Sequence, residues 1–206
     1  MAFRFSWKIL LALLPALFFS LMTPQANSQE PAHWKTYRHP GVPFEFSYPG
    51  DFLLDAHVNA KLGFIFALMK KQNTPWLIDV DFTDRAEYSM DPYSQMSLEE
   101  FAIATGRLAC DADGPEGSVS RPAVAHQKVL RNRNGLKVVE FYLNRVYEHY
   151  DPAKTTRSVI GPIEAVLLPT GRSGQVLTFK RTDRDQFGLV TDELLRRIAD
   201  SVKLAR

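Results

Sequence analysis

The sequence predicts an α+β fold: an antiparallel β-sheet with amphipathic helices packed on both sides, in an α/β/α-type sandwich. Three observations indicate this class. Several segments alternate apolar and polar residues, which is the period of half-buried strands. Two pairs of these segments are separated only by short turns, so their strands run antiparallel. Two other segments carry apolar residues at helical spacing, and each needs a sheet on which to bury its apolar face.

The first half of the chain contains three predicted strands. Residues 44–48 (FEFSY) alternate aromatic and polar side chains, whereas residues 63–69 are nearly all apolar and are typical of a central strand. Residues 76–84 form the third strand, in which Asp79 and Asp81 point away from the face that carries the apolar side chains.

The first predicted helix begins at a capping box. Ser97 and Glu100 are spaced so that each side chain can accept a hydrogen bond from the backbone N–H of the other. The apolar stripe that follows runs to about Cys110. Residues 111–118 (DADGPEGS) are turn-forming and end the helix.

Two hairpins follow the helix. Strands over residues 120–132 and 136–149 are joined by Asn-Gly at 134–135, a dipeptide that tolerates left-handed φ angles at both turn positions. Strands over residues 159–168 and 175–181 form the second hairpin.

The chain closes with a predicted amphipathic helix over residues 186–202. Arg196, Arg197 and Lys203 lie near its C-terminal end, where positive charge suits the helix dipole. Apolar residues recur every three or four positions and define the face that we expect to be buried: Phe187, Val190, Leu194, Ile198 and Val202.

The first 28 residues predict a secretory signal peptide. Arg4 and Lys8 precede an uncharged, mostly apolar run of 14 residues (9–22), and small residues occupy positions −3 and −1 of a cleavage before Gln29. The run is shorter than the about 20 residues of a bilayer span. We therefore expect no stable membrane span after cleavage; a signal that is kept as an anchor is the alternative.

The mature chain is expected to be a polar lead-in (29–34) followed by a single domain (35–206). Its expected location is the periplasm or the extracellular space of a bacterium. No cysteine directly follows the apolar run, so we expect no lipid attachment.

Charge argues against nucleic-acid binding. Without residues 1–28 the chain carries 23 basic and 23 acidic residues, and a nucleic-acid binder normally has a basic excess. Residues 29–120 hold 7 basic and 14 acidic side chains, and residues 121–206 hold 16 and 9. The opposite net charges of the two halves either offset each other within one domain or form a two-sided surface that binds a charged partner.

The single cysteine, Cys110, excludes an intramolecular disulfide. We expect a buried small residue at a helix end; an intermolecular disulfide is the alternative. A monomer is therefore favoured over a Cys110-linked dimer. A nucleophile paired with His126 or His149 is a third, weaker interpretation.

Three features together resemble the PsbP-like superfamily, which is named for the extrinsic subunit of photosystem II. They are the opening TYRHPGVPFEFSYPGDF (36–52), an amphipathic helix before paired hairpins, and the ending ELLRRIADSVKL (193–204). The resemblance implies a helix-covered antiparallel sheet. It also implies a non-enzymatic, exported protein with an assembly, scaffolding or partner-binding role.

Two sets of residues are candidate binding sites. Asp79, Asp81 and Asp84 could present carboxylates to calcium or manganese, although no cofactor is required by the sequence. A second acidic cluster, in the loop 111–116, lacks the full ligand spacing of a calcium loop. The other set, Tyr88, Met90 and Tyr93, lies in a connector where tyrosines offer large contact area to a protein partner.

The leading hypothesis is a non-catalytic exported interaction module with a protein partner in the cell envelope. Gly-x-Ser-x-Gly, P-loop, Gly-x-Gly-x-x-Gly and His-Glu-x-x-His motifs are all absent from the sequence. A carrier of a small ligand or a divalent metal is the first alternative. An enzyme whose residues come together from distant segments is the second.

Overall fold

The structure is a computed structural model. It describes residues 33–59, 63–88, 90–111, 119–120, 122–148, 151, 153, 155–170 and 174–205. The predicted signal peptide and nearly all of the lead-in lie outside these residues. So do His149 and most of the acidic loop 111–116.

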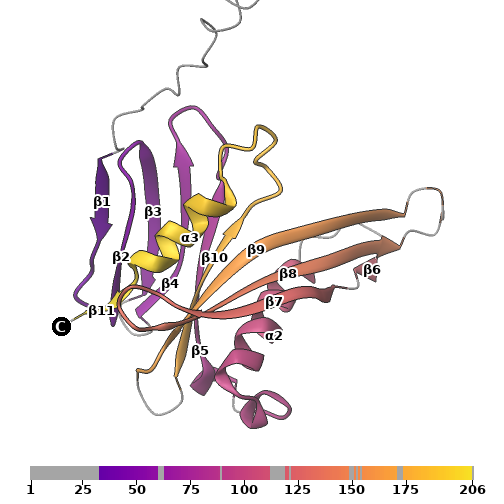
Figure 1. The fold of residues 1–206 in the computed structure, drawn as a ribbon, viewed down its shortest axis with the longest axis horizontal. Helices are drawn as coiled ribbons and strands as arrows, with labels where there is room; N and C mark the ends of the chain where they lie inside the picture. The colour runs from indigo at the N-terminus through magenta and orange to yellow at the C-terminus, as the bar shows by residue number, and fades with distance from the viewer. Residues whose placement is uncertain are drawn as a thin grey trace, which may run out of the picture. The chain divides into compact units, whose positions relative to one another are not determined.

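An antiparallel sheet of eight strands organises the described part of the chain (Figure 1). Its order is β3–β4–β5–β10–β9–β8, and β7 and β6 pair with successive parts of the outer edge of β8. The strands are β3 (Phe52–Asn59), β4 (Gly63–Lys71), β5 (Ile78–Asp84), β6 (Val119–Ser120), β7 (Ala123–Arg131), β8 (Lys137–Glu148), β9 (Thr156–Leu168) and β10 (Gln175–Arg181). A smaller sheet contains β1 (Trp34–Tyr37), β2 (Phe44–Pro49) and β11 (Lys203–Leu204).

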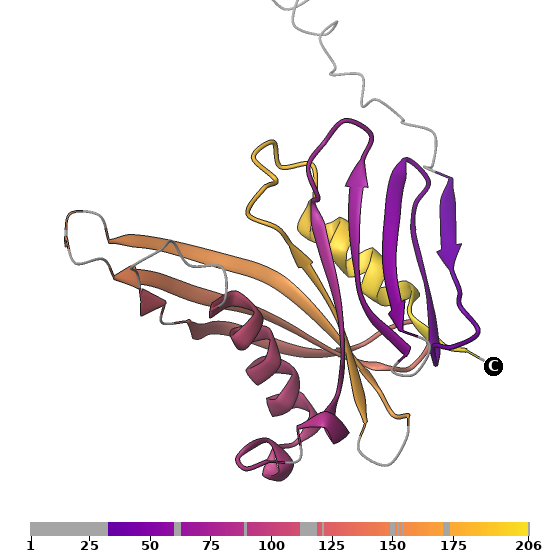
Figure 2. The ribbon, with the colours of Figure 1, turned by 180° about the vertical axis from the view of Figure 1, so that it is seen from behind.

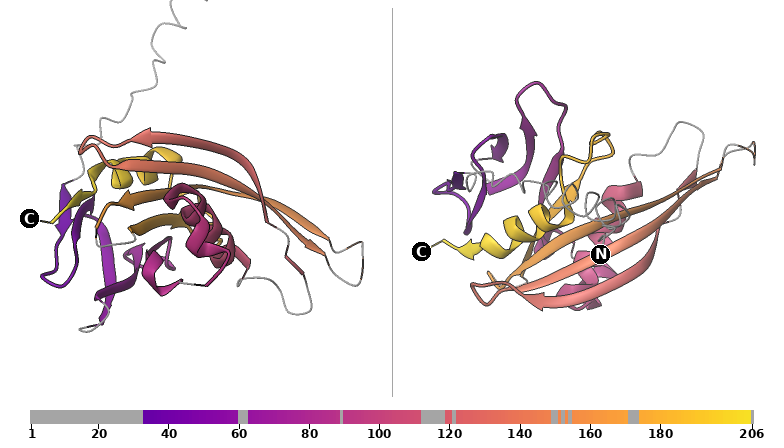
Figure 3. Two further views of the ribbon diagram at one scale, coloured as in Figure 1. Left: turned by 90° about the horizontal axis from the view of Figure 1, so that it is seen from below. Right: turned by 45° about the horizontal axis from the view of Figure 1, so that its top comes forward.

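The two helices cover opposite faces of the large sheet, as predicted. α3 (Asp192–Ser201) lies in front of the sheet in Figure 1, and α2 (Leu98–Asp111) lies in front of it in Figure 2. Alternation along β9 supports this arrangement: Ile163 and Ala165 join the apolar cluster under α2, whereas Val166 and Leu168 join the cluster under α3. The paired outer ends of β8 and β9 extend beyond both helices (Figure 3).

The capping box at the start of α2 is confirmed. The backbone N–H of Ser97 donates to Glu100 Oε2 at 2.7 Å, and the backbone N–H of Glu100 donates to Ser97 Oγ at 3.2 Å. Two N–H groups that the helix itself cannot satisfy are thereby paired. A local sequence signal therefore fixes where α2 begins.

The β7–β8 hairpin is confirmed, but its turn is not the predicted two-residue turn. Gly135 has a left-handed φ of 81°, whereas Asn134 does not. The buried Asn132 amide sets a wider loop, because its oxygen accepts from the backbone N–H groups of Asn134 and Leu136 at 3.0 and 2.9 Å. Its nitrogen donates to the Val202 carbonyl at 2.8 Å, which ties the hairpin to the end of α3.

The closing helix is shorter than predicted. It begins at Asp192, because Gly188 has a left-handed φ of 62° and the Asp185 carboxylate accepts from the backbone N–H groups of residues 189 and 190, both at 2.8 Å. Thr191 caps the helix by accepting from Leu194 N. An Asx-type turn has therefore displaced the first predicted helical turns.

The predicted buried stripe is confirmed at Val190, Ile198 and Val202 but is wrong at Phe187. Phe187 is 80% exposed, and the helix buries Leu195, Ile198 and Ala199. Three strands, β1, β3 and β11, were not predicted, and β1 begins within the expected lead-in. Within the described residues, no helix is both long and apolar enough to cross a membrane.

Candidate functional site

The connector between β5 and α2 is a structured segment rather than an open loop. We call residues 85–96 the tyrosine segment; it contains the short 3-10 helices η2 (Arg85–Glu87) and η3 (Tyr93–Gln95). Asp84 caps η2 by accepting from Ala86 N at 2.9 Å. Arg85 Nη2 donates across the segment to the Ser94 carbonyl at 2.9 Å. These bonds hold the two ends of the segment together.

The two tyrosines of this segment pack on α2. The Tyr88 and Tyr93 rings lie 5.5 Å apart, edge to face, and both meet the buried Phe101 ring, at 5.5 and 6.4 Å. Met90 lies between them in the sequence and is 78% exposed. The structure thus brings the three predicted contact residues onto one segment, with the tyrosines partly buried and the methionine open to solvent.

The three predicted metal ligands have other contacts. Lys180 Nζ lies 3.6 Å from Asp79 Oδ2, and Asp84 accepts from Ala86 N and from Gln175 Nε2, the latter at 2.8 Å. Among the described side chains, no group of three or more His, Cys, Asp or Glu is arranged to hold a metal ion. The calcium or manganese site on Asp79, Asp81 and Asp84 therefore stays a prediction, and Asp79 and Asp84 have other partners in this structure.

Cys110 lies near the C-terminal end of α2 and is 1% exposed. A disulfide to a second chain would require this helix end to open. His126 is on β7 opposite Tyr142 in the pairing register, on the side of the sheet that carries α3. The sheet thus lies between Cys110 and His126 and separates the proposed nucleophile from this base.

A cavity of about 490 Å³ lies beside the C-terminal end of α2; we call it the basic cavity. Among the described residues it is lined by Leu68, Trp76, Asp79, Cys110, Arg145, Ile160, Lys180, Arg181, Thr182, Asp183 and Arg184. The lining residues include four cations and two carboxylates, although the Arg181 side chain lies on the α3 face of the sheet, where it donates to Asp192. The cavity brings together Asp79 and Cys110, two residues that the sequence singled out for unrelated reasons.

Arg145 forms the buried part of this cavity and is 5% exposed. Its Nη1 donates to the Cys110 carbonyl at 3.1 Å and its Nη2 to Asp183 Oδ2 at 2.8 Å, while its guanidinium lies 4.4 Å from the Tyr147 ring centroid. Sequence reasoning missed this residue. The signal was present, because Arg145 continues the inward-facing positions Val139, Phe141 and Leu143 of β8.

The opposite face of the sheet carries a buried pair of carboxyl groups. Glu140 on β8 and Glu164 on β9 are directly opposite each other in register, and they are 4% and 1% exposed. Arg196 of α3 forms a salt bridge with Glu140, and its Nε lies 3.7 Å from Glu164 Oε1. This pair and its arginine connect α3 to the sheet.

The two carboxyl groups titrate differently. Burial, and then the negative charge of Glu140, raises the pKa of Glu164 to about 8. Burial opposes ionisation of Glu140 as well, but the hydrogen bond and the charge of Arg196 hold its pKa below its usual range. At neutral pH the pair therefore holds one proton, on Glu164, and one negative charge beside Arg196.

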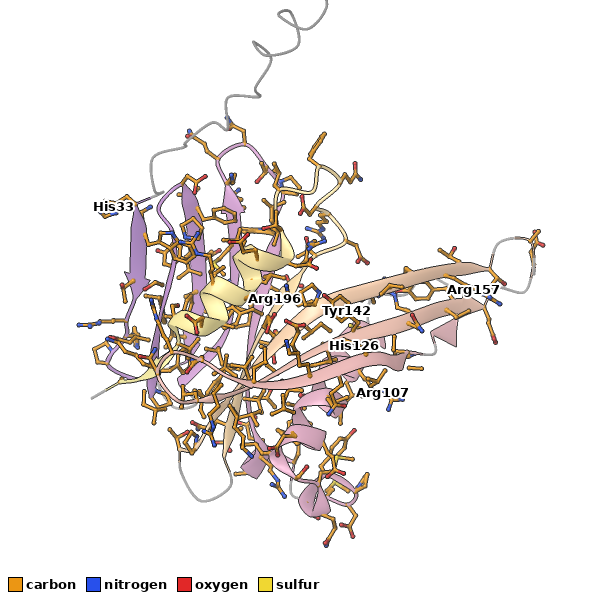
Figure 4. All side chains as sticks on the ribbon, viewed as in Figure 1. His33, Arg107, His126, Tyr142, Arg157 and Arg196 are labelled. Atoms are coloured by element: carbon orange, nitrogen blue, oxygen red, sulfur yellow. The ribbon has the colours of Figure 1, made fainter. Side chains whose placement is uncertain are left out.

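Further hydrogen bonds extend from this pair along α3. Arg196 Nη2 donates to Tyr142 Oη at 3.3 Å, and Tyr142 Oη donates to Asp192 Oδ2 at 3.2 Å. Asp192 also accepts from Arg181 Nη2 at 2.6 Å. Figure 4 shows Arg196 and Tyr142 next to each other beside α3, and Arg107 on α2.

Comparisons with known proteins bear on the fold. No protein-family model and no curated protein matches the sequence. The solution structure of cyanobacterial PsbP (CyanoP) from Synechocystis sp. PCC 6803 aligns with 89% of this chain and 99% of its own, at 14% identity and a TM-score of 0.51. The crystal structure of LpqN, described as involved in cell envelope biogenesis of Mycobacterium tuberculosis, aligns over 84% and 92%, at 13% identity and a TM-score of 0.41. The likeness to CyanoP shows that the fold is PsbP-like, as the sequence resemblance implied.

Proposed function

We propose that this protein is a non-catalytic, exported interaction module that binds a protein partner in the cell envelope through its tyrosine segment. Export is supported by the signal-peptide pattern of residues 1–28. A binding role is supported by the geometry of the tyrosine segment.

One observation carries the proposal: Met90 is exposed to solvent close in sequence to two tyrosines whose rings already pack on α2. Binding normally costs free energy when loops and side chains lose freedom. Here the rings of Tyr88 and Tyr93 already rest on Phe101, and Arg85 and Asp84 fix the segment's backbone. A partner that buries Met90 and the exposed parts of both rings would therefore meet a preorganised apolar surface.

The test is affinity capture of the full chain from the envelope of its own host, in parallel for wild type and two matched variants. Met90→Ala and Phe187→Ala each remove one large apolar side chain of nearly equal exposure, 78% and 80%. We expect Met90→Ala to lose a partner that wild type and Phe187→Ala retain. Equal recovery of the same proteins by all three would contradict the proposal.

A further inference from the structure

β7 is an edge strand of the large sheet, and its outer side is open. It pairs with β8 on one side, and within the described part of the chain no strand pairs with its other side (Figure 1). Eight of its nine residues are exposed, and the remaining one, Leu130, is partly buried. An edge strand presents backbone N–H and C=O groups that an added strand can pair with.

The register of the β7–β8 hairpin shows which backbone groups face this open edge. The backbone N–H of Asn132 donates to the carbonyl of Leu136 at 2.9 Å, and these two residues are directly opposite when the register is continued by one position. Hydrogen-bonded and non-hydrogen-bonded pairs alternate along an antiparallel ladder. The N–H and C=O groups of Gln127, Val129 and Arg131 therefore point away from β8, toward the open edge.

The charges of β7 are all positive. Residues 117–139 contain no Asp or Glu, whereas Lys128 and Arg131 lie on β7 together with His126, which Figure 4 labels. Arg131 Nη1 donates to the Gly135 carbonyl at 2.9 Å, and neither Arg131 nor Lys128 forms a salt bridge with a carboxylate of the described residues. Acidic side chains would therefore be favoured beside this edge.

The two sides of β7 present different chemistry. Val124 and Val129 are opposite residues of the apolar cluster under α2, so they lie on the α2 side, and they are 38% and 49% exposed. His126 and Lys128 are opposite the two residues of β8 that contact Arg196, so they lie on the α3 side. Because successive side chains of a strand point to opposite faces, the strand that fits here alternates apolar and acidic residues.

We propose that the open edge of β7 pairs with an extended segment of a partner protein whose side chains alternate between acidic and apolar. This surface is separate from the tyrosine segment. Backbone pairing along residues 127–131 would supply the hydrogen bonds, and acidic side chains opposite Lys128 would select the partner. A second copy of β7 is a poorer match, because two basic strands would place like charges side by side.

The test is fluorescence anisotropy of the full chain with labelled peptides as long as β7. The main probe alternates Glu and Val. A Lys-Val peptide reverses the charge, and a Glu-Pro peptide keeps the charge but lacks the N–H of every second residue. The Glu-Val peptide should bind more tightly than both others, and more weakly as salt is added. No binding of the Glu-Val peptide, or binding no tighter than that of either control peptide, would overturn the proposal.

Variants of β7 locate the peptide. Val129→Pro removes an N–H that points toward the open edge and keeps the hydrogen bonds to β8, whereas Val129→Ala changes only the side chain. Loss of this donor should weaken binding of the Glu-Val peptide by about five-fold, and Val129→Ala should weaken it less. Lys128→Glu replaces attraction with repulsion and should also weaken binding by about five-fold. Arg107→Gln, an exposed change on α2, is the charge control and should bind as wild type does.

Lys128→Glu keeps the test valid if Val129→Pro disturbs β7, and circular dichroism shows whether each variant is folded. Peptide affinities of both variants equal to that of Arg107→Gln would overturn the proposal. So would sedimentation of the protein alone as a dimer that Val129→Pro dissociates, because a second copy would then occupy the edge. Met90→Ala should leave peptide binding unchanged, so this proposal and the proposed partner contact at Met90 can fail separately.

Discussion

The two faces of the large sheet use their charged residues in different ways. On the α3 face, Arg196 is paired with Glu140 and Glu164, and Asp192 with Arg181 and Tyr142. On the α2 face, the buried Arg145 guanidinium donates to Asp183 and to the Cys110 carbonyl beside the basic cavity, and its Nε has no hydrogen-bond partner. Charges on the α3 face therefore hold the helix to the sheet, whereas several charged residues on the α2 face line a cavity.

The helices explain part of this difference. α3 is short and buries Leu195, Ile198 and Ala199 in a cluster that also includes strands of both sheets. α2 packs Phe101 and Ala102 on the sheet and leaves the basic cavity beside its C-terminal end. The tyrosine segment lies at its N-terminal end. Both candidate sites therefore belong to the α2 face.

The largest effect should come from the α3 core. Leu195→Ala removes a fully buried side chain and should lower the free energy of unfolding by about 3 kcal/mol. Leu108→Ala on α2, where the side chain is 45% exposed, should lower it by less than about 1 kcal/mol. Urea denaturation of both variants checks the difference. Equal losses in the free energy of unfolding would contradict the placement of Leu195 in the core beneath α3.

The buried carboxyl pair makes stability depend on pH. Burial raises the pKa of Glu164 to about 8 in the folded state, from an ordinary value of 4.5, so the folded state holds a proton that the unfolded state releases. This contribution is complete below pH 4.5 and is lost as pH rises through about 8. Between pH 5 and 8 the free energy of unfolding should fall by about 1 kcal/mol per pH unit.

Glu164→Gln isolates this contribution, because the amide keeps the shape and does not titrate. The variant should show a much flatter stability profile between pH 5 and 8, measured by urea denaturation at each pH. Glu193→Gln, a change in the first turn of α3 outside the pair, is the matched control and should keep the wild-type slope. A wild-type slope in Glu164→Gln would show that the pair holds no proton.

A moderate effect is expected at the tyrosine segment. Tyr93→Ala removes ring contacts with Tyr88 and Phe101 and should lower the free energy of unfolding by about 1 kcal/mol. Met90→Ala should change it by less than about 0.5 kcal/mol, because that side chain is exposed. Thermal unfolding of both variants measures this difference in stability. A loss of stability in Met90→Ala equal to that in Tyr93→Ala would mean that Met90 is part of the fold rather than its contact surface.

The smallest effect concerns Cys110, which should be inert in the folded protein. Its thiol is buried, so a thiol reagent should label it only on unfolding. Mass spectrometry after timed exposure to iodoacetamide, with and without urea, measures this protection. Rapid labelling of the native chain would show that the Cys110 thiol is accessible and would favour an intermolecular disulfide at this residue.

Local signals allowed the sequence to predict much of the fold. The Ser97–Glu100 capping box and the alternation in β2, β5 and β8 are confirmed. The predictions of the closing helix and of the hairpin turn were wrong because side-chain oxygens there accept hydrogen bonds from backbone N–H groups. Asp185 accepts N–H groups that the predicted helix would have used, and Asn132 widens the predicted hairpin turn.

The candidate sites were harder to predict, because they depend on contacts between distant segments. The tyrosine segment was visible as a cluster within the sequence. The basic cavity was not, since Arg145, Lys180 and Arg184 come together only when β8, β10 and the end of α2 are assembled. The charge excess of residues 121–206 was its only trace in the sequence.

The proposed partner contact is centred on the exposed Met90 of the tyrosine segment. The most direct measurement is photo-cross-linking in the host, with a benzophenone amino acid at position 90 or 187 of the full chain. We predict a specific cross-link to an envelope protein from position 90 and none from position 187. A cross-link to the same protein from position 187, with none from position 90, would contradict it.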